Sequence, residues 1–396
     1  MTIEKTAEAP VGNWFRISHI SAGFIAVLVG YTSSVAIIFQ AAQAAGATPA
    51  ELNSWMWALG IGMGASCIGL SLRYRSPVLT AWSTPGAALL VTSLQGLSMS
   101  QAIGVFLFSS LLITLSGMTG WFQKLMQTMP RHIAAAMLAG ILIRFGMDLF
   151  TAMQTQWLMV GLMFITFVLG RVWLPRYTVP LALAVGIACA GALGLLHLDT
   201  LSWTPAQPLF MAPEFSLSAL IGVGIPLFIV TMTSQNVPGL AVLRANGYNT
   251  PASPLIGWTG AIGLLLGPFG GFSFNLAAIT AAICMSKDAD PDPAKRYGSA
   301  IWAGVFYLAT GIFGATVVGL FAAFPTELVA AIAGLALLGT IANSLAGALA
   351  EEQGREAALV TFICTASGLT FMGIGSAFWG LVFGMAVHLF ARRIVR

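Results

Sequence analysis

Two groups of polar and helix-breaking residues interrupt long apolar stretches of the chain, and residues of these types can bind a small ligand. The later group reads Gly267-Pro268-Phe269-Gly270-Gly271-Phe272-Ser273-Phe274-Asn275. Glycine and proline so closely spaced cannot continue a helix, and the alternating aromatic residues favour a few extended residues. Asn275 is a good N-cap for the apolar run at 276–285. The pattern predicts an extended piece that turns into a short half-helix.

The earlier group has the same plan and reads Ser76-Pro77-Val78-Leu79-Thr80-Ala81-Trp82-Ser83-Thr84-Pro85-Gly86. Pro77 corresponds to Pro268, and Thr84 corresponds to Asn275 as the predicted N-cap. Pro85 then takes the first helical position, where its missing N–H costs nothing. We expect a second half-helix to begin here.

Two half-helices that start at the same depth favour the binding of an anion. Each start presents unsatisfied N–H groups and a partial positive charge of roughly half a unit, and no acidic residue lies near either interruption. The neighbouring aromatic residues could hold a ring while the helix starts hold a carboxylate. The predicted substrate-binding residues are Tyr31, Trp82, Ser83, Thr84, Gly86, Gln235, Gly271, Phe272, Ser273, Phe274 and Asn275.

Each of these residues also has a structural explanation. Aromatic side chains in a membrane protein more often pack than touch a ligand, and small polar residues cap the backbone or let helices approach closely. For Gly60, Gly62 and Gly64 we expect close packing alone. An intramembrane hydrolase with Ser273 as nucleophile is a remote alternative, because all four histidines lie near segment ends and leave no base beside it.

The sequence predicts no enzyme, metal site or cofactor. It contains no phosphate-binding Gly-Lys-Ser/Thr loop. The cysteines lie singly in apolar segments, so neither disulfides nor a zinc site are expected. They are Cys67, Cys189, Cys284 and Cys364.

Composition sets the fold class. Of the 396 residues, 58% are hydrophobic and only 8% are charged, and the mean hydropathy is +0.88. Charge-free apolar runs are long enough to cross a bilayer at about 20 residues each. These features predict an all-α polytopic membrane protein that stays in a lipid bilayer. The first apolar segment is too long for a signal peptide, so we expect a short N-terminal tail before it.

About fourteen apolar segments are expected. They lie at 17–45, 53–72, 77–95, 101–122, 131–150, 156–174, 178–197, 217–242, 254–268, 270–286, 298–323, 326–348, 356–373 and 375–391. With this count, sixteen of the seventeen Lys and Arg residues fall on the side that holds both termini. The positive-inside rule makes that side cytoplasmic, so the net charge of +4 reflects topology and not nucleic-acid binding. Arg144, the exception, lies one helical turn from Asp148, and we expect the two to pair.

The segments are predicted to form two repeats of opposite topology, at 1–200 and 213–396, as in many secondary transporters. The broken third and tenth segments correspond, each with a short extended strand before its half-helix. The polar runs Val29–Ser34 and Val230–Gln235 correspond in the first and eighth segments. Two matched breaks that enter the membrane from opposite sides are what an inverted repeat requires.

This plan resembles the elevator-type superfamily of nucleobase, sulphate and bicarbonate transporters. More specifically, Ser83-Thr84-Pro85-Gly86 and Gly270-Gly271-Phe272-Ser273-Phe274-Asn275 resemble the bacterial benzoate/proton symporter family, and the likeness spans nearly the whole chain. Nucleobase transporters carry acidic residues where this chain has Gln235 and Phe274. The difference argues against nucleobase recognition and against proton coupling through acids at those two positions.

The resemblance implies a core domain at 17–122 and 217–323, which holds the substrate between the half-helices, and a gate domain at 131–197 and 326–391. It implies secondary transport of an aromatic carboxylate such as benzoate, coupled to a proton, across the bacterial inner membrane, and it allows a homodimer. A passive anion channel, or a transporter of another small anion or a nucleobase, is the alternative, since the same half-helix site would serve it.

Overall fold

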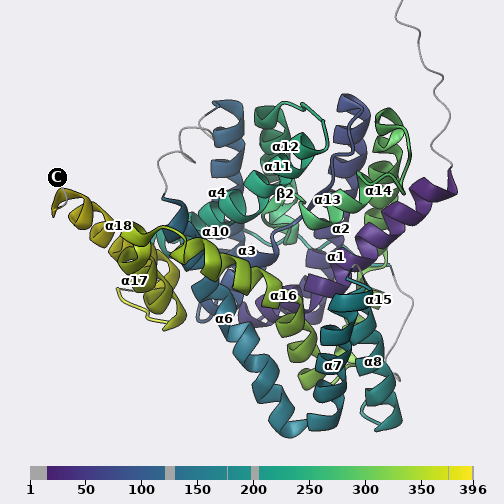
Figure 1. Cartoon of the computed structure of the whole chain (residues 1–396), viewed down its shortest axis with the longest axis horizontal. Helices are drawn as coiled ribbons and strands as arrows, with labels where there is room; N and C mark the ends of the chain where they lie inside the picture. The colour runs from purple at the N-terminus through teal and green to yellow at the C-terminus, as the bar shows by residue number, and fades with distance from the viewer. Residues whose placement is uncertain (1–15, 121–129, 176, 198–204, 373, 395–396) are drawn as a thin grey trace, which may run out of the picture.

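The computed structural model describes residues 16–120, 130–175, 177–197, 205–372 and 374–394 (Figure 1). The predicted N-terminal tail lies outside these residues. The first half of the chain forms α1 (Ile17–Ala44), α2 (Pro49–Tyr74), β1 (Thr80–Trp82), α3 (Thr84–Ser93), α4 (Met99–Met118), α6 (Arg131–Thr155), α7 (Trp157–Trp173) and α8 (Thr178–Ala192).

The second half begins with a span in which two π turns join three helical pieces: α9 (Leu217–Ala219), η2 (Leu220–Gly224), α10 (Ile225–Thr231), η3 (Met232–Asn236) and α11 (Val237–Ala245). It continues with α12 (Ala252–Leu266), β2 (Phe274–Leu276), α13 (Ile279–Cys284), α14 (Tyr297–Ile312), α15 (Gly314–Ala322), α16 (Thr326–Leu349), α17 (Arg355–Ala366) and α18 (Ser376–Ile394). Three short 3-10 turns connect these elements: η4 (Gly267–Phe269), η5 (Pro293–Lys295) and η6 (Glu352–Gly354).

The helices are those of a multi-pass membrane protein. Within the described ranges, seven are long and apolar enough to cross a membrane, or eight if the bent pair α14 and α15 is one span. The helices α7, α8 and α18 are shorter and also apolar. The all-α membrane fold expected from composition is therefore confirmed, while the count of about fourteen segments stays a prediction.

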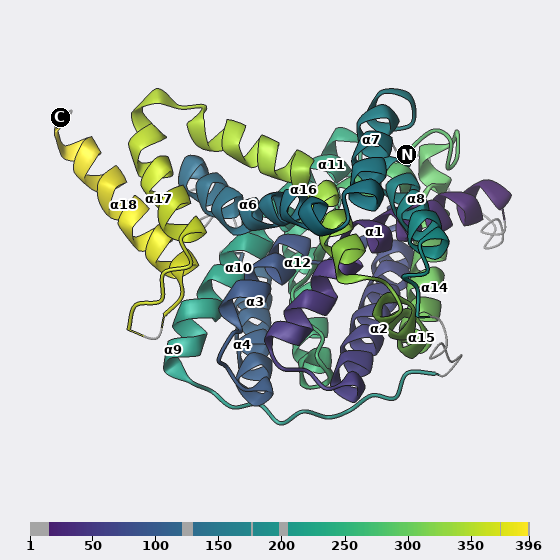
Figure 2. The same cartoon turned by 90° about the horizontal axis from the view of Figure 1, so that it is seen from below.

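The helices pack in two groups. In one, α2 packs against α14, α4 packs against α12, and α1 packs against α14, α3 and α13. In the other, α6 packs against α16 and α17, α17 packs against α18, and α7 packs against α8. Figure 1 shows the first group in the upper part of the molecule and the second below it, and Figure 2 shows α17 and α18 at one end. The groups meet where α1 contacts α16 and α8.

Glycines let the helices of the first group approach closely. A Cβ at Gly60 of α2 would lie 2.4 Å from the Gly311 Cα of α14, and one at Gly64 would lie 2.8 Å from the Gly304 carbonyl oxygen. Small residues have this role where no water drives helices together. The packing role expected for Gly60 and Gly64 matches these contacts, and Gly62 makes room for the Phe274 ring in the same way.

A two-stranded antiparallel sheet joins the two interruptions. Thr80 pairs with Leu276, Ala81 with Asn275 and Trp82 with Phe274. Two further bonds extend the ladder, from the Ser83 N–H to the Ser273 carbonyl (3.1 Å) and from the Ala277 N–H to the Leu79 carbonyl (2.9 Å). Each interruption therefore supplies the hydrogen-bond partners that the other lacks, as non-helical backbone inside a membrane requires.

The predicted N-caps are wrong at both half-helices. Ser83, not Thr84, caps α3, because the Ser83 hydroxyl accepts the Gly86 N–H (3.0 Å) and Thr84 is already helical. Asn275 lies inside β2, where pairing holds the backbone extended through Ala277. As a result, α13 begins only at Ile279 and is much shorter than the predicted run at 276–285.

Two other expectations are also corrected. The predicted continuous segment at 298–323 is the pair α14 and α15, which bends by 68° at Phe313 between Gly311 and Gly314. No ion pair joins Arg144 to Asp148 among the described residues, because Arg144 lies exposed on the outside of α6 while Asp148 faces a separate cavity.

The contact between α2 and α14 can be tested in one helix. Gly60→Val should disrupt the packing, because its Cβ would overlap the backbone of α14, and overpacking of this kind costs about 1–3 kcal/mol or more. Gly69→Val in the same helix is the control, since nothing lies within 4 Å of its Cβ position. Thermal unfolding of the detergent-purified variants should show a lower midpoint for Gly60→Val only. Equal midpoints would contradict the described helix contact.

Candidate functional site

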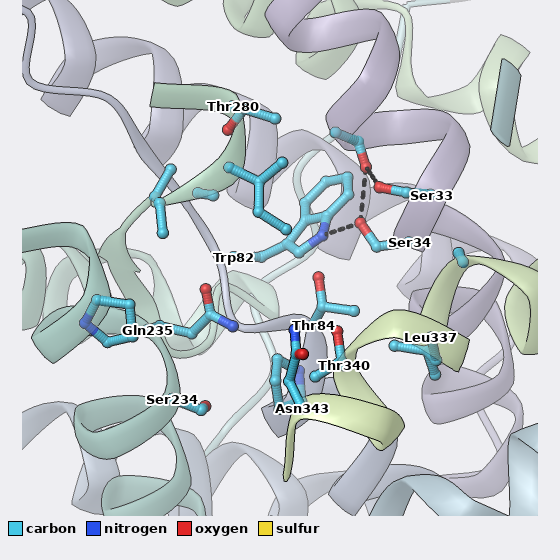
Figure 3. Close-up of a pocket in the computed structure, with 18 of the residues that line it drawn as sticks. Ser33, Ser34, Trp82, Thr84, Ser234, Gln235, Thr280, Leu337, Thr340 and Asn343 are labelled. Atoms are coloured by element: carbon cyan, nitrogen blue, oxygen red, sulfur yellow. Dashed lines mark hydrogen bonds between the residues drawn. The ribbon is translucent and has the colours of Figure 1, made fainter. Parts of the chain in front are cut away.

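A cavity of about 1100 Å³ lies between the two helix groups. Its walls come from α1, α3, η3, α11 and α13 on one side and from α6, α8 and α16 on the other. The lining is largely apolar, with polar side chains placed at intervals, as is typical of small-molecule sites. Figure 3 shows many of them: Ser33, Ser34, Thr84, Ser234, Gln235, Thr280, Thr340 and Asn343.

Three of the predicted substrate-binding residues line this cavity: Trp82, Thr84 and Gln235. The Trp82 ring is fixed, because its Nε1 donates to the Ser34 hydroxyl at 2.8 Å (Figure 3) and because it packs edge-to-face with the Tyr31 ring, with ring centroids 4.8 Å apart. Tyr31 itself is buried behind Trp82. The tryptophan therefore presents a rigid aromatic wall to the cavity.

Ser83 and Gly86 shape the start of α3 without lining the cavity. Ser83 is fully buried as the N-cap. A Cβ at Gly86 would lie 2.8 Å from the Ser83 Oγ and 2.9 Å from a methyl carbon of Leu227 on α10. Glycine at this position thus allows the half-helix start to press against α10.

The predicted residues of the later interruption point away from the cavity. Phe272 packs between Trp55 and Phe106, with ring centroids 5.8 and 5.1 Å away, and Phe274 fills the space above Gly62. Both rings are buried, as are Gly271, Ser273 and Asn275. Asn275 donates to the Ser273 carbonyl at 2.9 Å, and Ser273 adopts a left-handed φ of 45°.

The later interruption reaches the cavity only after Asn275. Ala277, Ala278, Ile279 and Thr280 line it, at the end of β2 and the start of α13. At this start Ala282 donates to the Ala278 carbonyl, and the N–H groups of residues 279–281 have no intrahelical acceptor. Among the described residues no other backbone acceptor reaches them. Ile279 and Thr280 line the cavity, so N–H groups without an intrahelical acceptor, which carry a partial positive charge, lie beside it.

The start of α3 is less rich in free donors. Pro85 has no N–H, the Gly86 N–H is used by Ser83, and the Ala87 N–H donates to the Ser83 carbonyl at 2.7 Å. Only the Thr84 N–H and hydroxyl remain at this end for a ligand. The two half-helices therefore contribute unequally, with α13 as the stronger donor.

Sequence reasoning missed the contribution of α16. Thr340, Asn343 and Ser344 line the cavity from this helix, opposite Gln235. Figure 3 shows the polar groups of Gln235, Thr84 and Asn343 directed into the cavity. A signal was present, because polar residues within the apolar helix need partners at membrane depth.

The π turn η3 places Gln235. Pro238 lacks the N–H that would bond to Ser234 one turn earlier, so the helix widens over Met232–Asn236. Asn236 then donates to the Met232 sulfur and accepts the Leu276 N–H at 2.9 Å, which ties this turn to β2. Gln235 is left facing the cavity with its amide unpaired by any described residue.

One end of the cavity carries a positive charge. Of the described residues that line it, Arg131 alone is charged, and no described carboxylate lies within ion-pair distance of its guanidinium. It stands at the exposed start of α6. The cavity thus combines a cationic rim with a neutral, donor-rich interior.

The far end of α13 is anchored by a polar cluster. Arg296 donates to the carbonyls of Met285 (2.8 Å) and Asp290 (2.7 Å), and the Asp290 carboxylate contacts His19 (2.9 Å) and Arg16 (3.0 Å). Burial of Asp290 opposes its ionisation, but the hydrogen bonds from Asp292 and His19 and the charge of Arg16 outweigh burial and lower the pKa of this loop carboxyl. The short half-helix is therefore held at both ends.

Comparison with known proteins identifies the family of this chain. The family profile of the benzoate membrane transport protein matches residues 13–390. The chain is 51% identical to the inner membrane protein YdcO of Escherichia coli K12, over 92% of this chain and 93% of that protein. It is 43% identical to the benzoate membrane transport protein of Acinetobacter baylyi, over 94% and 95% of the two chains.

Solved structures show the same fold at low sequence identity. The transmembrane domain of the cyanobacterial bicarbonate transporter BicA aligns with a TM-score of 0.58 at 13% identity, over 95% of this chain and 96% of that one. The structure of SLC26A9 aligns with a TM-score of 0.62 at 12% identity, over 94% of this chain and 65% of that one. At this level of identity, the likeness concerns the fold alone.

The position of the cavity predicts which side chains water can reach. Thr84→Cys and Thr340→Cys should react with a charged, membrane-impermeant thiol reagent, because both positions line the cavity. Ser273→Cys should stay unreacted, since Ser273 is fully buried. The background would carry Cys189→Ala and Cys364→Ala, the two native cysteines that are not buried. Equal labelling rates at Ser273→Cys and Thr84→Cys would contradict the described site.

Proposed function

The chain belongs to the benzoate membrane transport protein family, and we propose that it carries an aromatic carboxylate such as benzoate across the bacterial inner membrane in symport with a proton. One observation carries the choice of substrate. The cavity places a fixed indole wall next to the free N–H groups of a half-helix, and its described lining contains no carboxylate. An aromatic ring and an anionic group are the two features that such walls can hold together.

In the proposed binding mode, the carboxylate accepts hydrogen bonds from the start of α13 and from the Thr84 and Thr280 hydroxyls. The ring lies against Trp82, and the amides of Gln235 and Asn343 complete the polar wall. Recognition then rests on backbone dipoles, neutral donors and buried apolar area, which contributes about 25 cal/mol per Å².

We further propose that transport follows an elevator mechanism. The core at 17–122 and 217–323 would slide against the gate at 131–197 and 326–391. The location of the cavity between the two helix groups supports this division, as does the antiparallel pairing of the two breaks, which suits an inverted repeat. With both termini cytoplasmic, the rim at Arg131 faces the cytoplasm, and the structure corresponds to an inward-open state.

A passive anion channel would need a continuous polar path through the protein. The segment 35–39 of α1, directly beyond the cavity residue Ser34, is apolar and buried. This closed end favours a carrier over a pore. Another small anion would bind to the same hydrogen-bond donors as an aromatic carboxylate, but without a ring that packs against Trp82.

Uptake into liposomes tests the proposal. Initial rates of labelled benzoate uptake, corrected for diffusion into protein-free vesicles, should saturate and should rise when unlabelled benzoate is present inside. Acidifying the outside should stimulate them further if a proton moves with the substrate. Rates that rise without limit and show no counterflow would instead indicate a pore. Saturable uptake of labelled sulphate or uracil that benzoate does not inhibit would indicate a different substrate.

Gln235→Glu tests the sign of the ligand charge. A carboxylate at this position would repel a bound anion in a medium of low effective dielectric, so the dissociation constant for benzoate should rise at least about tenfold, or about 1.4 kcal/mol. Gln95→Glu is the matched control, because Gln95 is exposed in the loop after α3 and does not line the cavity. Isothermal titration of both variants gives the comparison. An unchanged affinity in Gln235→Glu would rule out the proposed carboxylate position.

A further inference from the structure

A second, smaller cavity of about 370 Å³ lies farther along the same helices. It is lined by Gln40, Gln43, Phe145, Asp148, Phe321, Ala322, Phe324, Thr326, Val329 and Ala330. The helices α1, α6 and α16 contribute residues to both cavities. On each helix the residues that line the smaller cavity lie on one side, along the chain, of those that line the main cavity. The two cavities therefore lie along one interface between the helix groups.

A dry layer separates them. On α1 it consists of residues 35–39, on α6 of residues 139–142 and on α16 of residues 331–335, all of them apolar and buried. From Ser34 to Gln40 the rise along α1 is about 9 Å. A small displacement of α1 against α6 and α16 would thus close one cavity and enlarge the other.

Asp148 gives the smaller cavity its chemistry. Its side chain is half-buried, and among the described residues it has no ion pair and no hydrogen bond. It is the only acidic residue of the described helices that is not within the first or last turn of its helix. A carboxylate so placed within a membrane protein indicates a functional role.

Among the described residues, none forms an ion pair with Asp148. On α6 the nearest ionisable group is Arg144, which is exposed and unpaired with it. On α16 it is Glu327, which accepts hydrogen bonds from Thr155 and Thr326, both at 3.3 Å. The lining residues of α1 are the neutral Gln40 and Gln43, and those of α15 and the loop after it are uncharged. The loop after α8 adds one titratable group on this side, His197, whose backbone N–H donates to the Ala323 carbonyl at 3.1 Å.

The rest of the lining suits an aromatic acid. Phe145, Phe321 and Phe324 surround the space with rings, and Gln40 and Gln43 add amides that no described residue engages. An anionic substrate beside an ionised Asp148 would be repelled. Two carboxylates side by side avoid this by sharing one proton, and the shared proton forms a strong, charge-assisted hydrogen bond.

We propose that the smaller cavity is the outer subsite for the carboxylate, and that the substrate enters it together with one proton shared with Asp148. The proposal rests on the function proposed above and assigns to it a residue for proton dependence. A proton from the outer solution binds an Asp148 oxygen, its O–H donates to the substrate carboxylate, and the pair carries a single negative charge. The proton leaves with the substrate or returns to the solution when the subsite empties.

The test is the pH dependence of entry from outside. In proteoliposomes with outward-oriented protein, the apparent KM for external benzoate should rise about tenfold per pH unit above the range in which the shared proton is held. Asp148→Asn keeps a hydrogen-bond donor without a titrating proton, so its KM should be independent of external pH. Glu327→Gln is the matched control and should keep the wild-type slope, because Glu327 does not line the cavity.

The outcomes separate the two proposals. Wild-type protein that shows no saturable benzoate uptake would refute the proposed function and leave the subsite without a substrate. Asp148→Asn that retains counterflow and also retains the wild-type pH slope would overturn the role of Asp148. Replacing external sodium by N-methylglucamine should leave the KM for benzoate unchanged. If the KM depends on sodium and Asp148→Asn abolishes that dependence, the ion that binds Asp148 is an alkali cation, and the proton assignment is overturned. If Asp148→Asn folds poorly, Asp148→Glu takes its place in the test. This variant keeps a titrating carboxyl, so its KM for external benzoate should still depend on pH.

Discussion

The arrangement of this protein depends on one constraint, the hydrogen bonding of extended backbone inside a membrane. Each unsatisfied peptide group in hydrocarbon costs several kcal/mol, so a single broken helix cannot be placed there alone. The chain meets this constraint by pairing β1 with β2 and by adding the bonds of Ser83 to Ser273 and of Ala277 to Leu79. Each interruption is stable because the other exists.

The pairing also decides where the ligand donors lie. Because the ladder runs through Ala277, helix α13 begins only at Ile279, and Ile279 and Thr280 at its start line the cavity beyond the strands. At the other interruption the ladder ends at Ser83, which caps α3 immediately and leaves few free donors. Two interruptions of similar sequence thus contribute unequally to one site, and the polar cluster around Arg296 holds the shorter helix in place.

The sequence predicts the membrane fold and both breaks, because long apolar runs and clustered glycine and proline allow few alternatives. The exact caps are harder to predict, since Ser83 and Thr84 are both good caps and only strand pairing chooses between them. The sequence predicts that Phe272 and Phe274 contact the ligand, yet both rings are buried in the core after the turn at Gly270 (φ 91°). Trp82, Thr84 and Gln235 line the cavity. The first two lie beside the glycine and proline of the earlier break, and Gln235 ends the polar run of the eighth segment, whereas the helix that carries Asn343 has no such break.

Behind Arg131, the described residues that line the cavity carry partial charges and no full charge, and this suits a carrier. An unpaired Arg buried at the site would be costly whenever the site is empty, because a lone buried charge has lost its hydration without gaining a partner. The N–H groups of α13 and the amides of Gln235 and Asn343 can bond to water when the site is empty. The empty and loaded states therefore differ less in free energy than they would with a buried Arg at the site. Backbone dipoles of this kind attract any anion. In the proposed function, selectivity among anions comes from the side chains around them, above all from the fixed ring of Trp82.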